Sequence, residues 1–291
     1  MNSVTRALRR FVNKLTGKNK IIFFVVLFLI CVVAICIAIY GQYFYKYSDT
    51  DPLMIGIHIG AKKTTEEYAS LKSDFNNLFT NELHSNVENL KVDKINTSQN
   101  VVYTYNKVEN KDENYYDVNV KIPTLNINNE SAKKINSEII EKFDKKAKDI
   151  MTNPEEGYTI YKVDYVAFVN NGIVSIAIKE NFKTGSKGET VTITTYNYNI
   201  PEKSEIELKD LIKLKETDVE TVQKNIISSI ESVALKNNDV AKEYGGLIRN
   251  SQDKMYKIEN TKNAFLTDDG YVYIVYDYAD KNTNEIDIVI F

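Results

Sequence analysis

The sequence predicts an α+β fold, in which an antiparallel sheet has helices packed on one face and one N-terminal transmembrane helix precedes it. Three observations support this fold class. An uncharged apolar segment lies near the N-terminus, blocks of strand-like and helix-like residues follow it, and short turn signals join consecutive strands. Strands that are joined by hairpins and interrupted by helices are typical of an antiparallel sheet with one covered face.

The apolar segment comprises twenty residues without a charge, IIFFVVLFLICVVAICIAIY, from Ile21 to Tyr40. At about 1.5 Å per residue, such a helix matches the roughly 30 Å hydrocarbon core of a bilayer. A buried helix of a globular core seldom runs this long without a polar face. The aromatic residues that anchor a helix at the membrane interface follow at once: Tyr43, Phe44, Tyr45 and Tyr47. We therefore predict a transmembrane helix over residues 21–42, with the lipid bilayer as its partner.

The charges on the two sides of this segment differ in sign. Residues 1–20 hold six of the 37 basic residues and no acidic one, so 31 basic and 40 acidic residues follow the segment, a net charge of −9. The positive-inside rule places a basic N-terminus in the cytoplasm. We therefore predict a single-pass protein of the cell membrane with its C-terminal part outside. An acidic outer part does not suit nucleic acid, and the basic stub at 1–20 suits anionic lipids.

A cleaved signal peptide is the main alternative for the apolar segment. The segment is longer than the usual apolar core of about 7–15 residues, and no A-x-A-like cleavage site follows it. Neither Cys31 nor Cys36 is preceded by the small residue that a lipid-attachment site needs, so we predict an uncleaved signal anchor. These are the only two cysteines, and the outer part therefore has no disulfide framework and no thiol nucleophile.

Residues 43–100 are predicted to connect the membrane to the outer domain. A strand is expected at Met54–Ile59 and another at Val87–Ile95. Between them, Thr64 or Thr65 can begin an amphipathic helix. Its apolar face would consist of Tyr68, Leu71, Phe75, Leu78 and Phe79, which recur at helical spacing.

Residues 101–291 are predicted to form the outer α+β domain. Val101–Val108 and Asn114–Pro123 alternate as strands do, and the polar sequence ENKDEN marks the turn near their junction. A helix that Asn129 or Ser131 can cap comes next. Its buried face would consist of Ile135, Ile139, Phe143, Ala147 and Ile150.

The second half of this domain begins with strands at Tyr158–Val169 and Ile173–Phe182. The Asn170-Asn171-Gly172 sequence between them is a strong hairpin signal, and a third antiparallel strand is expected at Glu189–Asn199. A second helix follows, and then two closing strands. The helix covers Asp218–Lys236 with Val222, Ile226, Ile227 and Ile230 facing inward, and the strands are Tyr271–Tyr278 and Glu285–Phe291.

The sequence shows no pattern typical of a catalytic or metal site. His58, in a strand or connector, and His84, at an expected helix end, have no second ligand at a metal-binding spacing. Acidic pairs are unavoidable among 40 acidic residues, and Asp268-Asp269-Gly270 is typical of a turn. We expect a protein that is not an enzyme and has no cofactor. A cell-wall hydrolase that uses a carboxylate pair is the enzymatic alternative.

The loop Gly185-Ser186-Lys187-Gly188 shares residue types with a phosphate-binding P-loop. A P-loop needs its own glycine spacing and a helix directly after it, whereas the strand-like TVTITTYNYN follows here. We therefore predict the tip of a hairpin. Because tyrosines on strands suit contact with carbohydrate or protein, the predicted binding residues are this loop together with Tyr196 and Tyr198.

Short motifs of the outer domain resemble a known family. The segment YYDVNVKIPTL…ESAKKINSEI has a strand that ends near Pro123 and a helix with Ile135-Asn136, and LKDL follows at Leu208–Leu211. With the closing strands, these features of residues 115–291 resemble the extracytoplasmic domain of RsiV-type anti-sigma factors, which is also found beside peptidoglycan deacetylase domains. The resemblance implies an outward domain that binds a cell-wall component or a lysozyme-like protein, and a sigma factor as a cytoplasmic partner.

Two features depart from the family pattern. Family members often carry a Gly-Gly-Ala-His-Gly-type loop before the tyrosine-rich strand, whereas Gly185–Gly188 has no histidine. The stub at 1–20 is short for a segment that holds a sigma factor, although its apolar residues have the spacing of a small amphipathic helix: Val4, Leu8, Phe11 and Leu15. The sequence therefore predicts a membrane-anchored, non-catalytic binding or sensing domain. An RsiV-like anti-sigma factor is the alternative.

Overall fold

The computed structural model describes residues 54–58, 75–86, 91–154, 156–281 and 283–291, together with Gly17, Val25 and Val26. The part from Leu53 to Phe291 is one compact unit. Among the residues described, no helix is long and apolar enough to cross a membrane. Apart from Gly17, Val25 and Val26, the predicted stub and the predicted span at 21–42 lie outside the described residues.

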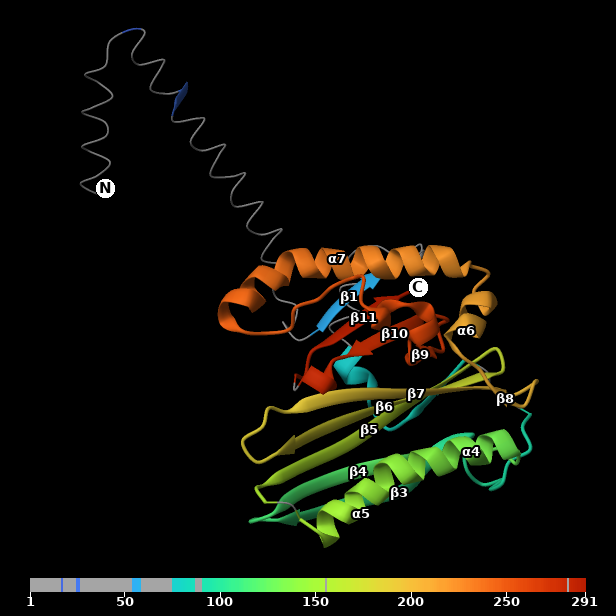
Figure 1. Cartoon of the computed structure of the whole chain (residues 1–291). Coiled ribbons are helices and arrows are strands. Elements are labelled where there is room, and N and C mark those ends of the chain that lie inside the picture. Colours follow the sequence, from blue (N-terminus) through green and yellow to red (C-terminus); the bar gives the residue numbers. More distant parts are fainter. Residues whose placement is uncertain are drawn as a thin grey trace. The chain divides into compact units, whose positions relative to one another are not determined.

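Two β-sheets lie face to face in the compact unit, and helices cover the outer side of each (Figure 1). One sheet has seven strands and the other has four. The predicted α+β class is confirmed. The predicted single sheet with helices on one face is wrong, because the closing strands form a second sheet that has helices of its own.

The seven-stranded sheet follows the order β3-β4-β5-β6-β7-β8, and β2 pairs with part of β5. The bounds of these strands are β2 Leu83–Ser85, β3 Val102–Asp112, β4 Tyr116–Leu125, β5 Thr159–Asn170, β6 Ile173–Thr184, β7 Thr190–Asn199 and β8 Ser204–Glu205. All the predicted strands between 101 and 199 are therefore confirmed. Strand β2 was not predicted, and residues 91–95 are not the strand that was expected there.

This sheet is mixed and not antiparallel as predicted. Strand β4 pairs with β5 in parallel, with Tyr116 opposite Thr159, and β2 also pairs with β5 in parallel. The reason is the helical segment between β4 and β5. A chain that crosses over through a helix returns to the same end of the sheet, so the next strand runs in the same direction.

That helical segment comprises α4 (Glu130–Ile139), a π-helical stretch η2 (Ile140–Asp144) and α5 (Lys145–Thr152). Asn129 caps it by accepting a hydrogen bond from the Ser131 N–H, which settles the choice between the two predicted caps. Four of the five apolar residues expected to face inward are fully buried, and Ile150 packs against them. The four are Ile135, Ile139, Phe143 and Ala147.

The turn between β5 and β6 confirms the predicted hairpin. Asn171 and Gly172 have φ angles of 46° and 82°. Two consecutive residues with positive φ define the type I′ turn that matches the twist of the flanking strands, and Asn-Gly is the preferred pair for it. The sequence signal therefore placed this turn correctly.

The four-stranded sheet follows the order β1-β11-β10-β9. Its strands are β1 Met54–His58, β9 Asn263–Leu266, β10 Val272–Asp277 and β11 Ile286–Ile290. Strand β1, from the predicted connector, pairs in parallel with β11, and the other pairs are antiparallel. The expected strand at Met54–Ile59 is thus confirmed, and it joins segments more than two hundred residues apart in the sequence.

Helices α6 (Leu208–Leu214) and α7 (Val219–Tyr244) cover the outer face of the four-stranded sheet (Figure 1). Asp218 caps α7 by accepting a hydrogen bond from the Thr221 N–H, and the helix runs eight residues beyond its predicted end. Single turns of 3-10 helix occur at η1 Phe75–Leu78, η3 Lys254–Tyr256, η4 Ile258–Asn260 and η5 Ala279–Lys281.

The core between the two sheets is aromatic and aliphatic. The Phe265 ring stacks on Phe168 and on Tyr273, with centroids 5.8 and 5.0 Å apart, and Phe75 packs beside it. Since side chains alternate along a strand, β11 sends Ile286, Ile288 and Ile290 into this core and Asp287 and Val289 toward the helices.

Candidate functional site: a polar cleft between the sheets

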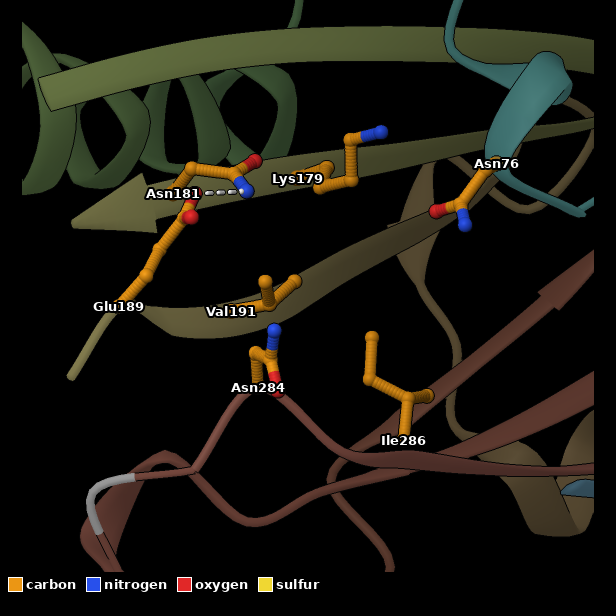
Figure 2. A pocket seen from close by; sticks show the side chains of 7 residues that line it. All are labelled: Asn76, Lys179, Asn181, Glu189, Val191, Asn284 and Ile286. Atoms are coloured by element: carbon orange, nitrogen blue, oxygen red, sulfur yellow. Dashed lines mark hydrogen bonds between the residues drawn. The ribbon is translucent and has the colours of Figure 1, made fainter. Parts of the chain in front are cut away.

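A cleft of about 150 Å³ opens where the inner face of β6 and β7 meets the segment that enters β11 (Figure 2). The short helix η1 contributes a further side chain. Polar side chains line the cleft, except at two apolar positions. The lining residues are Asn76, Lys179, Asn181, Glu189, Val191, Asn284 and Ile286.

Lys179 is the only cation among these lining residues. Its Nζ lies 4.7 Å from the centre of the Phe79 ring, a distance at which a cation and an aromatic face attract. Within the part of the chain that the structure describes, no carboxylate forms an ion pair with Lys179. Burial lowers the pKa of this ammonium below that of an ordinary lysine, and the charge of Asp164 on β5 only partly offsets the effect.

The remaining polar groups of the cleft are three amides and one carboxylate. The Asn181 Nδ2 donates to Glu189 Oε1 at 2.8 Å, so these two side chains hold each other in place at one edge (Figure 2). Asn76 and Asn284 line the cleft from η1 and from the residues before β11. Val191 and Ile286 supply an apolar surface, so the cleft can hold a small ligand through charge, hydrogen bonds and an apolar contact.

The predicted binding loop is the tip of the β6–β7 hairpin, as expected. The Gly185 N–H donates to the Tyr158 carbonyl at 2.9 Å. A Cβ on Gly157 would come within 2.9 Å of the Gly185 Cα, so only glycine fits at that contact. Ser186, Lys187 and Gly188 are exposed, and Glu189 of the cleft follows them directly.

Tyr196 and Tyr198 are not part of this surface. Both lie on the side of β7 that faces α4 and α5, and near the end of the strand away from the loop. Tyr198 is 1% exposed, and its hydroxyl has no hydrogen-bond partner within the described part of the chain. The structure therefore does not join the two tyrosines with Gly185–Gly188 in one site.

Tyr196 borders a shallow hollow between β7 and the helical segment of α4 and η2. The other lining residues are Lys134, Ser137, Glu138, Glu141 and Lys142. Burial, together with the smaller effect of the Glu138 and Glu205 carboxylates, raises the pKa of the Tyr196 hydroxyl to about 12. The hydroxyl therefore stays protonated at neutral pH.

A buried charged cluster lies on the other side of β11, and the sequence did not reveal it. Arg249 donates through Nε and Nη2 to both oxygens of Asp287, at 2.7 and 3.1 Å, and through Nη2 to Glu285 at 2.7 Å. The Tyr278 hydroxyl donates to Asp287 and lies 2.6 Å from the Tyr256 hydroxyl.

This cluster fixes the segment after α7 to the sheet. Burial lowers the pKa of Arg249, but the hydrogen bonds and charge of Asp287 outweigh that effect and leave it above the ordinary value. The backbone of Arg249 is held as well, because Asn238 on α7 bonds both its N–H and its carbonyl.

His84 and the acidic pair Asp268-Asp269 have structural surroundings. His84 lies in β2, and not at the predicted helix end, and its ring stacks on Phe168 with centroids 5.4 Å apart. Gly270, with φ of 89°, ends the predicted Asp268-Asp269-Gly270 turn. No group of three or more His, Cys, Asp or Glu residues suited to a metal occurs in the described part of the chain.

A change of pattern within β6 is the signal that points to the cleft in the sequence. The first half, IVSIAI, is buried on both sides, whereas four of the six residues of KENFKT are partly exposed, so Lys179 begins the part of the strand that the second sheet no longer covers. Asn76 and Asn284 carry no such signal, because only the packing of distant segments brings them to the cleft.

Fold and site together define a two-sheet α+β domain with a small polar cleft between the sheets. No protein-family model matches the sequence, and no curated protein does. A crystal structure of a DUF3298 family protein from Pseudomonas aeruginosa is similar, with 13% identity, a TM-score of 0.35, and coverage of 59% of this chain and 81% of that one. A DUF3298 family member from Bacteroides fragilis has 12% identity, a TM-score of 0.27, and coverage of 61% and 85%.

Proposed function

We propose that the protein is a single-pass membrane protein whose outer domain binds or senses an envelope ligand without catalysing a reaction. The ligand is a cell-wall component or a lysozyme-like protein. Residues 21–42 hold the chain in the bilayer, with residues 1–20 in the cytoplasm and the C-terminal part outside.

The cleft around Lys179 is the observation that supports a binding role. It combines one cation, three amides, a carboxylate and two apolar side chains in about 150 Å³. Small binding sites are typically concave, with a few fixed polar groups beside an apolar surface. Two of those polar groups, Asn181 and Glu189, are already fixed by their mutual hydrogen bond.

The charge of the outer part supports a cationic protein as one of the two ligands. With 31 basic and 40 acidic residues after the apolar segment, the net charge is −9. A cationic lysozyme-like protein would be attracted to it, and such attraction raises the association rate at low salt.

An anti-sigma factor is the second proposal, and the stub at residues 1–20 favours it. Val4, Leu8, Phe11 and Leu15 have the spacing of an amphipathic helix, whose apolar face suits a protein partner. If so, deletion of residues 2–16 should release a sigma factor and increase transcription of its regulon, while the protein stays in the membrane.

The proposal is tested with the full-length protein in lipid nanodiscs. Binding of lysozyme and of soluble peptidoglycan fragments is measured by biolayer interferometry, and release of fragments from intact peptidoglycan is followed by chromatography. We expect binding of at least one ligand and no turnover. Turnover that alanine substitution of a single carboxylate abolishes would show a hydrolase instead. Protease protection in sealed vesicles tests the orientation.

A further inference from the structure

Lys179 in the cleft differs from the lysines on the helix side of the sheet in the groups that contact its ammonium. On the helix side of β6, Lys146 pairs with Glu180 at 2.6 Å, and Lys142 donates to the Thr194 hydroxyl at 2.7 Å. Lys179, on the opposite side of the same strand, has the Phe79 ring but no ion pair within the described residues. Its ammonium therefore retains the capacity to bind an anion.

The other groups of the cleft narrow the choice of anion. Asn76 and Asn284 carry amides that can pair with a peptide group or another amide. Val191 and Ile286 favour a small apolar group beside these amides. A phosphate would use the lysine and the amide N–H donors, but neither the amide carbonyl oxygens nor the apolar surface, whereas the last residue of a peptide uses all of these groups.

The size of the cleft agrees with one such residue. An engineered protein cavity of about 150 Å³ holds benzene, which has six heavy atoms. A terminal alanine has the same number of heavy atoms, counting both carboxylate oxygens. Because the cleft opens to solvent, the rest of a peptide can extend outward past Glu189.

We propose that the cleft binds the C-terminal carboxylate of a short peptide with a small last residue, and that Lys179 pairs with this carboxylate. This assignment rests on the proposed binding function and names the chemistry of its ligand. The Asn284 amide bonds the last peptide group, and Val191 and Ile286 contact the terminal side chain.

The test uses full-length protein in nanodiscs and N-acetyl-alanyl-alanine as the probe, followed by saturation-transfer NMR. An ordinary protein C-terminus and a cell-wall stem peptide have the same terminal functional groups. Separate measurements with the L-alanine and the D-alanine form of the probe distinguish them by stereochemistry. We expect binding of the acid, and at least a tenfold weaker interaction of the C-terminal amide, because a charge-assisted hydrogen bond is lost.

Lys179→Met should weaken binding of the acid at least tenfold and leave the weak binding of the amide unchanged. Lys183→Met is the matched control, since Lys183 lies on the same strand and face but outside the cleft. Equal binding of acid and amide would overturn the assignment, and so would full binding by a folded Lys179→Met variant.

The outcomes separate this assignment from the broader proposal. If lysozyme or peptidoglycan fragments bind Lys179→Met as well as the parent protein, the binding function stands and the cleft is not its site. If the peptide acid binds in a Lys179-dependent way while neither envelope ligand binds, the cleft is a carboxylate site and the proposed ligands are wrong.

Discussion

Arg249 and Lys179 are both partly or fully buried cations that lie over an aromatic ring, yet their surroundings differ. Arg249 lies 5.4 Å from the Tyr278 ring centre and has two carboxylates at 2.7 Å. Lys179 lies 4.7 Å from the Phe79 ring centre, and no carboxylate among the described residues pairs with it. The difference indicates a structural role for the first and a ligand-binding role for the second.

The chain uses opposite faces of one strand for these two environments. Asp287 faces the helices and completes the arginine cluster, while its neighbour Ile286 faces the other sheet and lines the cleft. A substitution at an even-numbered position of β11 therefore alters the side that faces the other sheet, and one at an odd-numbered position alters the side that faces the helices.

The largest effect is expected from Asp287→Asn. It leaves the Arg249 guanidinium buried with Glu285 as its only carboxylate, and breaking a buried ion pair from one side costs about 3–5 kcal/mol. Urea unfolding of the variant and parent measures the difference. A loss below about 1 kcal/mol would contradict the structural role of the cluster. Lys213→Met, which removes an exposed partner of Asp210, is a control that should cost little.

A pH dependence is expected for peptide binding in the cleft. The protonated form of Lys179 binds the ionised carboxylate, so affinity is constant near neutral pH and falls above the lysine pKa, by at most about tenfold per pH unit, toward the weak binding that remains without the charge pair. Because burial lowers this pKa, the fall begins below the pH at which an ordinary lysine titrates.

The other charged groups near Lys179 bear on the same measurement. Asp164 faces it from β5 and also lies 3.6 Å from the Lys121 Nζ, and Glu189 lies at the edge of the cleft. Calorimetric titration from pH 6 to pH 10 measures the profile, and a flat profile would exclude Lys179 as the binding cation.

A smaller effect is expected from Tyr198→Phe. The Tyr198 hydroxyl is buried and has no hydrogen-bond partner in the described part of the chain, so its removal relieves a desolvation cost. We expect a gain of about 1 kcal/mol in unfolding free energy, with ligand binding unchanged. A loss of binding in this folded variant would restore the sequence-based assignment of Tyr198 to the site.

The smallest effect on stability is expected from Lys179→Met. The variant keeps an apolar stem against Phe79. It loses the stabilising cation–π contact but also avoids the cost of burying a charge, so the two effects on stability oppose each other. We expect a change within about 1 kcal/mol by thermal unfolding. A loss as large as that of Asp287→Asn would assign Lys179 a structural role.

Local patterns predicted the elements of the outer domain well. The Asn171-Gly172 turn, the Asn129 cap and the alternation of the strands each depend on neighbouring residues, and each was found where expected. The parallel pairing of β4 and β5 was missed, although the helix between them implies it.

The site was harder to predict, for a physical reason. The loop at Gly185–Gly188 was correctly placed at a hairpin tip, and it adjoins the cleft through Glu189. The cleft itself depends on how far the second sheet extends over the first. That overlap is set by packing around Phe265 and by residues as distant in sequence as Asn76 and Asn284, so no local pattern reports it.

The position of β11 has a consequence for the order in which the domain folds. This strand lies inside the four-stranded sheet, between β10 and β1. The pairing of Met54 with Ile286 closes a loop of more than two hundred residues, and such distant contacts form late. During synthesis, β1 emerges early, and β11, the strand that pairs with it among the described residues, is made last. Until then, β1 is a segment without its pairing strand, and such unpaired strands can pair with other chains.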